Sequence, residues 1–327
     1  MITLLACPKP FQGHIEIIQR NAIKSWTLLS PKPEIMLMGV ENGVAEICKE
    51  FNLIHVPDVD QTEYGTPLVS SVFQIGQARA SASVVCYVNS DIMLTNDFMR
   101  AIEIVTAKMS RFLVLGQRTD IDINEPWNFE GMDWEEDLKN LLAQKGKLHA
   151  PTGIDFFCFP KGMYEDMPPL VIGRPGFDNW LVWRARVQGF PLVDVTEAVH
   201  IAHQNHESTY VLRTLNAQEF GSMKAKDDSR WIKSEKNWVE LVPDAKQNIM
   251  LVPDEKNLHI WAATWMVDRK GRLGRRRLML QPAYLYYQLK YVVPIYWPAF
   301  GRVLRRIVSV SKDLFQRSTL KKHSGTA

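Results

Sequence analysis

The sequence predicts an α/β fold in which a mainly parallel sheet carries helices on both faces. Three observations lead to this prediction. The first 120 residues alternate short apolar runs with segments of helical periodicity, which is the pattern of βαβ units. An apolar run at residues 84–88 ends in Asn89-Ser90-Asp91, and open α/β sheets bind ligands at the carboxyl ends of their strands. Apolar residues make up 46% of the 327 positions, enough for one large core.

The expected elements of the first half each have their own signal. Strands are expected where apolar residues run together, at residues 2–7, 34–40, 53–56, 84–88 and 112–116. Helices are expected where apolar residues recur every three or four positions, at residues 14–28, 44–51, 67–80 and 96–108. Pro67 is placed at the start of the third helix, because its fixed φ suits that position. No basic stretch precedes the first apolar run, so that run is expected to be a strand and not a signal peptide.

Residues 119–150 interrupt the alternation. This segment is acidic, contains Trp127 and Trp134, and shows helical spacing only at residues 134–144. It is expected to be an insertion over the ligand edge of the sheet. Beyond it, strands are expected at residues 154–159 and 192–195, on either side of a helix at 177–187.

The cysteines indicate a reducing compartment and no zinc site. Cys7, Cys48, Cys86 and Cys158 lie far apart in apolar surroundings, and no Cys-x-x-Cys pair occurs. We interpret them as reduced core residues. With no signal peptide expected, the predicted localisation is cytoplasmic.

The group Asn89-Ser90-Asp91 is the first candidate site. A carboxylate at a strand end can hold Mg²⁺ or Mn²⁺, and such a cation can bridge the two phosphates of a nucleotide. The simpler interpretation is that Asp91 ends the strand or caps a turn.

Two later acids stand near glycines. Gly153 precedes an aromatic strand and would let backbone approach a ligand closely, while Asp155 within that strand needs a partner. The alternative is an ordinary strand with a turn at each end. Asp178 follows Gly176 near a helix start, where it could act as a general base. It could also serve only the helix dipole, which is worth at most about 1 kcal/mol.

Three histidines fall within seven positions, His200, His203 and His206. Neutral imidazole is a good ligand for Mn²⁺ or Zn²⁺. A single histidine is more often a hydrogen-bonded structural residue, so the cluster and not any one member carries the prediction.

Taken in order, these clusters resemble the GT-A superfamily of nucleotide-sugar glycosyltransferases, over about residues 1–207. The resemblance implies a Rossmann-like α/β/α sandwich. Gln77-Ala78-Arg79, followed by a strand and Asn89-Ser90-Asp91, is similar to the helix–strand–acid passage of that family. Asp91 matches the acid that binds metal or diphosphate. Asn89 departs from the pattern, in which Asp is more usual, and this leaves strict metal dependence open.

The resemblance also implies individual roles. Asp178 matches the catalytic base of inverting members, and His203 or His206 matches their late metal-binding histidine. The expected cofactor is a divalent cation, Mn²⁺ or Mg²⁺. The donor site implied in this way comprises Pro8, Lys9, Asp60, Arg79, Asn89, Ser90, Asp91, Gly153 and Asp155. A surface salt bridge would explain Arg79 equally well.

The C-terminal part differs sharply in charge. The whole chain carries a formal charge of +3, but from Arg269 onward 14 Lys and Arg face one acid, so residues 1–268 carry about −10. We therefore divide the chain into a transferase domain at 1–207, a Trp-rich extension at 208–268 and a basic aromatic tail at 269–327, and we expect the C-terminal extension to be mostly helical. Prolines and Lys290 interrupt the apolar runs of the tail, which favours an interfacial segment on anionic lipid over a spanning helix. A charged terminal helix packed on the domain is the alternative.

The leading hypothesis is an inverting, metal-assisted glycosyltransferase of polysaccharide biosynthesis, peripheral on the inner face of the membrane. Its expected partners are a nucleotide-sugar donor and a glycan or lipid-linked acceptor. A non-catalytic domain of the same fold that binds glycan or a partner enzyme stays open. A sugar-phosphate nucleotidyltransferase should have a Gly-rich phosphate loop where this chain reads CPKPFQGH. No helix-turn-helix, zinc or RNA-binding signature is present, so nucleic acid is not an expected partner.

Overall fold

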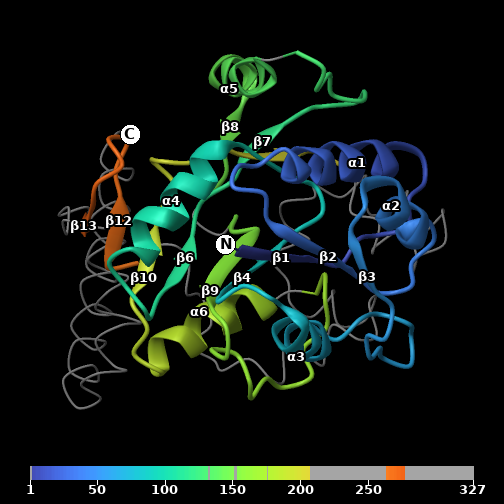
Figure 1. Ribbon diagram of the computed structural model, residues 1–327, viewed down its shortest axis with the longest axis horizontal. Coiled ribbons are helices and arrows are strands. Elements are labelled where there is room, and N and C mark those ends of the chain that lie inside the picture. Colours follow the sequence, from blue (N-terminus) through green and yellow to red (C-terminus); the bar gives the residue numbers. More distant parts are fainter. Residues whose placement is uncertain (1, 132, 151–152, 175, 207–262, 277–327) are drawn as a thin grey trace, which may run out of the picture.

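The computed structural model describes residues 2–131, 133–150, 153–174, 176–206 and 263–276 (Figure 1). Its centre is a nine-stranded sheet in the order β13-β12-β10-β6-β9-β4-β1-β2-β3. Neighbouring strands are parallel except at β9 and β13, which run antiparallel to the strands they pair with. The bounds are β1 Ile2–Ala6, β2 Glu34–Met38, β3 Ile54–Val56, β4 Val84–Val88, β6 Leu113–Leu115, β9 Phe156–Pro160, β10 Leu192–Asp194, β12 Trp265–Val267 and β13 Leu273–Arg275. The predicted α/β class with a mainly parallel sheet is confirmed.

Helices cover both faces of this sheet. Apolar side chains of α1, α2 and α4 pack in one core cluster, and those of α3 and α6 pack in a second cluster on the other face. Figure 1 shows the same division, with α1, α2 and α4 above the central strands and α3 and α6 below. The bounds are α1 Gly13–Thr27, α2 Val44–Phe51, α3 Val69–Arg79, α4 Asn96–Thr106 and α6 Phe177–Val187.

A second, four-stranded sheet in the order β5-β11-β7-β8 stands beside the ligand edge of the first. Its strands are β5 Ile92–Leu94, β7 Thr119–Ile121, β8 Lys147–Leu148 and β11 Ile201–Gln204. Helix α5, Trp134–Lys145, packs on it through its own small apolar cluster. The segment 119–150, expected as an insertion, thus contributes two strands and a helix. The sequence analysis predicted the helix and missed both strands.

The strand pairing determines which residues lie together at the carboxyl ends of the parallel strands. Strand β4 runs to Val88, and its antiparallel partner β9 starts opposite it, with Val88 facing Phe156. The residue after β4, Asn89, therefore lies beside the residue before β9, Asp155, and the backbone N–H of Asn89 donates to the Asp155 carbonyl at 2.9 Å. Because β1 and β4 are parallel, the loop that follows β1 reaches the same edge.

Two details differ from the sequence prediction. Pro67 does not open α3, because the helix starts at Val69 with Leu68 as its N-cap, and Pro67 instead bridges to Gln61. Strand β11 was not predicted, since two of its four buried residues are the polar His203 and Gln204.

Residues 265–267 and 273–275, from the extension and the tail, pair into the main sheet as β12 and β13. Most of 208–268 and 269–327 lies outside the described residues, so the three-part division remains a prediction. Within the described part of the chain, no helix is both long and apolar enough to cross a bilayer.

Candidate active site

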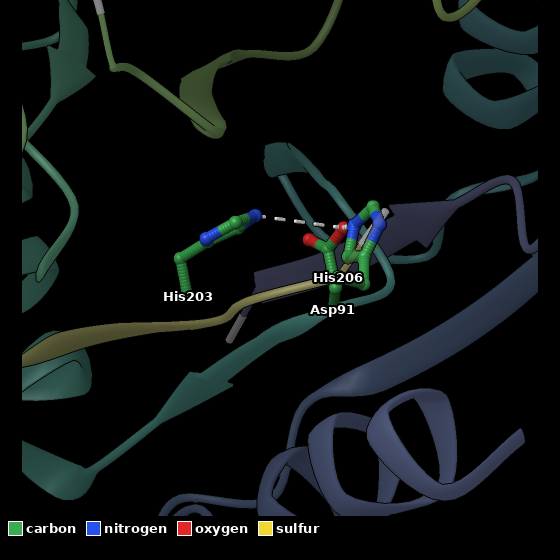
Figure 2. A group of neighbouring side chains, drawn as sticks. All are labelled: Asp91, His203 and His206. Atoms are coloured by element: carbon green, nitrogen blue, oxygen red, sulfur yellow. Dashed lines mark hydrogen bonds and ion pairs between the residues drawn. The ribbon is translucent and has the colours of Figure 1, made fainter. Parts of the chain in front are cut away.

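Asp91, His203 and His206 come together where the two sheets meet (Figure 2). Asp91 directly precedes β5, and antiparallel pairing of β5 with β11 sets His203 opposite Ile92. His206 follows two residues after β11 ends. The Nε2 atom of His206 is 2.9 Å from Asp91 Oδ2, and Nε2 of His203 is 4.0 Å from the same oxygen. One ligand atom of each residue lies within 4.8 Å of the others, close enough to hold one metal ion.

The electrostatics of Asp91 suit a cation ligand. Burial on its own would raise the pKa of this carboxyl group, but the hydrogen bond from His206 and the charges of His203 and Lys9 bring it below its usual range. The side chain is only 15% exposed. Its second oxygen, Oδ1, is buried and has no hydrogen-bond partner among the described residues. A buried carboxylate oxygen without a donor is costly unless something else fills that role.

The surroundings of His203 favour its neutral form at neutral pH. Burial lowers its pKa and the nearby Arg118 lowers it further, although the carboxylates of Asp91 and Asp155 act in the opposite direction. A neutral imidazole is the form that binds metal. The donor set of two imidazoles and one carboxylate, with an orphan oxygen on the carboxylate, therefore fits the divalent cation that the sequence analysis expected.

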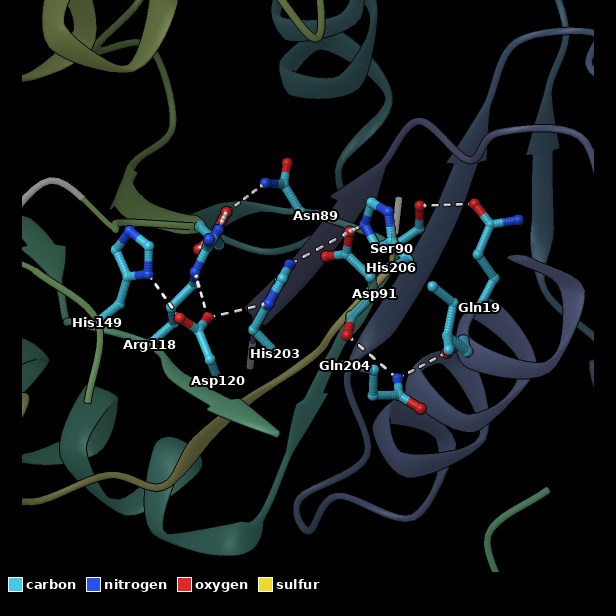
Figure 3. A network of polar contacts seen from close by, with 12 residues as sticks. Gln19, Asn89, Ser90, Asp91, Arg118, Asp120, His149, His203, Gln204 and His206 are labelled. Atoms are coloured by element: carbon cyan, nitrogen blue, oxygen red, sulfur yellow. Dashed lines mark hydrogen bonds and ion pairs between the residues drawn. The ribbon is translucent and has the colours of Figure 1, made fainter. Parts of the chain in front are cut away.

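A second layer of polar side chains backs this cluster (Figure 3). Asp120 on β7 lies between three groups: its Oδ1 is 3.1 Å from His203 Nδ1 and accepts from Arg118 Nε at 2.9 Å, while its Oδ2 is 2.6 Å from His149 Nδ1. The sequence analysis missed all three of Arg118, Asp120 and His149. The only available signal was a run of polar residues at the start of an insertion, and nothing in it pointed to residue 203.

Asp155 is the partner of Asn89. Its Oδ1 accepts from Asn89 Nδ2 at 2.7 Å, and both of its oxygens face Arg118 Nη1, at 3.2 and 3.0 Å. Asp155, an unusual residue beside an aromatic strand, is thus paired with the Arg118 guanidinium and accepts a hydrogen bond from the Asn89 amide. The charges of Asp155 and Asp91 both act on the pKa of His203.

On the other side of Asp91, Gln19 of α1 ties two predicted donor-site residues together. Its Oε1 accepts from the Lys9 backbone N–H at 2.7 Å and from the Ser90 hydroxyl at 3.0 Å, and its Nε2 donates to the Lys9 carbonyl at 2.9 Å. The charge of Lys9 reaches Asp91, as its effect on the Asp91 pKa shows. Pro8 is buried beside Lys9 at the end of β1.

Asp178 stands in the first turn of α6, and packing brings that turn to the end of β4. The Phe177 ring meets Tyr87 edge-on, with centroids 6.2 Å apart. Burial raises the pKa of Asp178 to about 6, and the charge of Asp155 adds to the rise, against backbone N–H groups that lower it. The charge of Asp155 therefore acts on both Asp178 and His203.

Other predicted site residues have different surroundings. Asp60 is exposed, and its backbone N–H donates to the Ser71 hydroxyl at 2.9 Å. Arg79 is 3.9 Å from the Asp58 carboxylate in an exposed ion pair, which is the alternative considered for it. Gly153 is buried and its carbonyl accepts from the Arg118 backbone at 3.1 Å.

The third histidine of the cluster is not with the other two. His200 lies against Asp97 of α4, with Nδ1 2.6 Å from Oδ2. His200 is therefore a hydrogen-bonded structural residue, the alternative that the sequence analysis allowed for any single histidine.

Comparisons with known proteins were made by sequence and by structure. No family profile and no curated protein matches the sequence. Among solved structures, S. aureus TarS 1–349 shows 11% identity and a TM-score of 0.43, over 78% of this chain and 84% of TarS 1–349. TarS 1–349 has also been solved with UDP-GlcNAc.

Two further solved structures are similar. A glucosyl-3-phosphoglycerate synthase from Mycobacterium tuberculosis, in complex with Mn²⁺, UDP and phosphoglyceric acid, has 14% identity and a TM-score of 0.37, over 69% of this chain and 75% of that chain. The mannosyltransferase PcManGT from Pyrobaculum calidifontis, in complex with GDP-Man and Mn²⁺, has 10% identity and a TM-score of 0.40, over 74% and 68%.

Proposed function

We propose that this protein is a metal-assisted, inverting glycosyltransferase that moves a sugar from a nucleotide-sugar donor to a glycan or lipid-linked acceptor. The observation that carries the proposal is the meeting of Asp91, His203 and His206 at the strand edge, with the Asp155 charge acting on both His203 and Asp178. A cation ligand set and an acid of raised pKa at the carboxyl ends of parallel strands are the parts that this reaction needs.

The cluster suits the donor end of the reaction. Asp91, His203 and His206 would hold the cation, and a cation there would offset the charge of the leaving nucleoside diphosphate. Two imidazoles and one carboxylate favour a transition ion such as Mn²⁺ over Mg²⁺, which prefers oxygen ligands. Lys9 supplies a further positive charge on the same side.

Asp178 suits the acceptor end. With a pKa of about 6 it is mostly ionised at neutral pH and still basic enough to take the proton of an attacking hydroxyl. If it receives that proton on the face of the sugar opposite the diphosphate, the anomeric centre inverts. In the donor site we keep Pro8, Asn89, Ser90, Gly153 and Asp155, with Asp60 and Arg79 as outer contacts.

The proposals for the acceptor and for the location both rest on the basic aromatic tail, residues 269–327. Its charge favours an anionic surface, so we propose a cytoplasmic protein that is peripheral on the membrane. Because β13 ends at Arg275 and belongs to the main sheet, the test is removal of residues 277–327 and not of the whole tail. Sedimentation with vesicles rich in anionic lipid should be lost in this variant, and unchanged sedimentation would refute the membrane proposal.

The activity is tested with the full chain, Mn²⁺ and a panel of radiolabelled nucleotide sugars. Asp178→Asn should abolish turnover and keep donor binding, since the residue acts on the acceptor proton. Asp91→Asn should lose donor and Mn²⁺ binding together. Asp97→Asn is the matched control, because Asp97 is also a first-turn helix acid in contact with a histidine. Donor binding without any turnover in wild type would favour the non-catalytic alternative.

A further inference from the structure

The three residues missed by the sequence analysis form a chain of contacts that ends on a proposed metal ligand. The side chain of Asp120 connects His203 on one side with His149 on the other. We infer that Asp120 is a positioning residue, which together with His149 fixes the His203 ring so that Nε2 faces Asp91. The inference rests on the proposed function, because it concerns the same metal site.

Backbone pairing sets the first contact. Strand β11 pairs parallel with β7, with His203 opposite Asp120, and antiparallel with β5, with His203 opposite Ile92. The ring is therefore placed between Asp120 and Asp91 by two strands at once. Its Nδ1 faces Asp120 Oδ1 at 3.1 Å and its Nε2 faces Asp91 Oδ2 at 4.0 Å.

This placement selects one tautomer of His203. A carboxylate next to Nδ1 favours the proton there, which leaves the lone pair on Nε2, on the side of Asp91 and His206. The Nδ1 atom is 3.1 Å from Asp120 Oδ1 but is not aligned to form a hydrogen bond with it.

Contacts with His149 and Arg118 in turn fix the orientation of the Asp120 carboxylate. Its Oδ2 is 2.6 Å from His149 Nδ1, and its Oδ1 accepts from Arg118 Nε at 2.9 Å. The backbone of His149 is fixed as well, because its N–H donates to the Arg118 carbonyl at 2.9 Å and its carbonyl accepts from Gln117 Nε2 at 3.0 Å.

Gly153 leaves the room that the His149 ring needs. A Cβ at this glycine would lie 2.4 Å from His149 Cδ2 and 2.7 Å from Cγ, distances that side chains do not tolerate. Its backbone φ is not in the left-handed region, so the close approach of His149 explains the glycine. A methyl group at position 153 would push the ring and, through Asp120, disturb His203.

The simpler role for Asp120 is to neutralise Arg118. In that role the variant Asp120→Asn would alter stability and leave metal affinity unchanged. A positioning role predicts a loss of Mn²⁺ affinity of about 10- to 100-fold, the range typical of residues that orient metal-bound histidines. It also predicts a change in the tautomer of His203, which charge neutralisation alone would not produce.

The test is titration of the full chain with Mn²⁺ alone, followed by electron paramagnetic resonance. Asp120→Asn should bind about 10- to 100-fold more weakly than wild type. Asp133→Asn, an exposed acid at the start of α5, is the matched control and should bind as wild type does. In ¹⁵N spectra of histidine-labelled protein, the Nδ1–H form of His203 should dominate in wild type and lose its dominance in Asp120→Asn.

A second variant, Gly153→Ala, should disturb the same site indirectly, through His149 and Asp120. Gly153→Ala should weaken Mn²⁺ binding, whereas Gly274→Ala, where a Cβ meets nothing within 4 Å, should not. Gly153→Ala therefore keeps the test open should Asp120→Asn fail to fold. Wild type that fails to bind Mn²⁺ would overturn the metal part of the proposed function and this inference with it. Wild type that binds, with both variants equal to it in affinity and tautomer, would overturn the positioning role alone.

Discussion

The pKa of Asp178 leads to a pH dependence that can be worked out in advance. If this carboxylate must be ionised to act, the rate follows its deprotonated fraction. With a pKa of about 6, that fraction is about 0.9 at pH 7 and about 0.1 at pH 5, so the rate should fall about tenfold. A carboxyl group with the ordinary value of 3.8 would lose less than about a tenth of the rate over the same interval.

The same shift acts on stability with a definite sign. The pKa of Asp178 is higher in the folded protein than in the unfolded chain, so the folded state binds the proton more tightly. Its contribution is fully present below the unfolded value near 4 and is lost as the pH rises toward about 6. Asp178→Asn should therefore stabilise the protein at pH 8, by at most about 3 kcal/mol at 1.36 kcal/mol per pKa unit, and leave stability at pH 4 nearly unchanged.

Two measurements check this reasoning. Initial rates at saturating donor and Mn²⁺ should be taken from pH 5 to pH 8, with donor binding followed in parallel to separate the loss of metal at low pH. Urea unfolding of wild type and Asp178→Asn at pH 4 and pH 8 gives the stability difference. A rate that stays flat between pH 7 and pH 5, or a variant that is less stable than wild type at pH 8, would refute the account of Asp178.

Two substitutions elsewhere test the packing. Asn89→Asp should not improve Mn²⁺ affinity although Asp is more usual there in the superfamily that the sequence resembles, because the new carboxylate would face Asp155 where an amide now donates at 2.7 Å. Tighter Mn²⁺ binding would contradict this. Gly76→Ala should destabilise by roughly 1–3 kcal/mol in urea unfolding, since its Cβ would lie 2.3 Å from Leu5 Cδ1 inside the core. Gly274→Ala has open space and should stay within about 0.5 kcal/mol of wild type, and equal losses in both variants would rule out overpacking as the cause.

The sequence predicted the elements whose signal is local. Strand β4 and helices α2 and α6 have the bounds that were expected, because an uninterrupted apolar run or a clear apolar periodicity fixes them. Strand β11 was missed because it buries His203 and Gln204, whose burial depends on partners far along the chain. Gln204 Nε2, for example, donates to the Ile18 carbonyl at 2.7 Å.

The candidate site residues likewise differ in whether a local sequence signal could predict them. Asp91, His203 and His206 could be chosen as candidates because of their residue types and, for Asp91, its position at a strand end, and they do lie together in the structure. The role of Asp120 could not be, since an aspartate in an acidic insertion looks solvated, and only the pairing of β7 with β11 brings it to His203. Gly153 was read as room for a ligand, whereas the space beside it is taken by His149.

The edge of the main sheet has a consequence for how the chain folds during synthesis. Strand β10 pairs with β6 on one side and with β12 on the other, and Asp194 at its end is 3.1 Å from Arg276. Until the ribosome has released β12, at residues 265–267, the outer side of β10 lacks this strand, and until Arg276 has emerged the Asp194 carboxylate lacks this guanidinium. An open strand edge invites association with other chains. Nascent chains that stall before β12 should therefore be the ones that chaperones hold and that aggregate when chaperones are scarce.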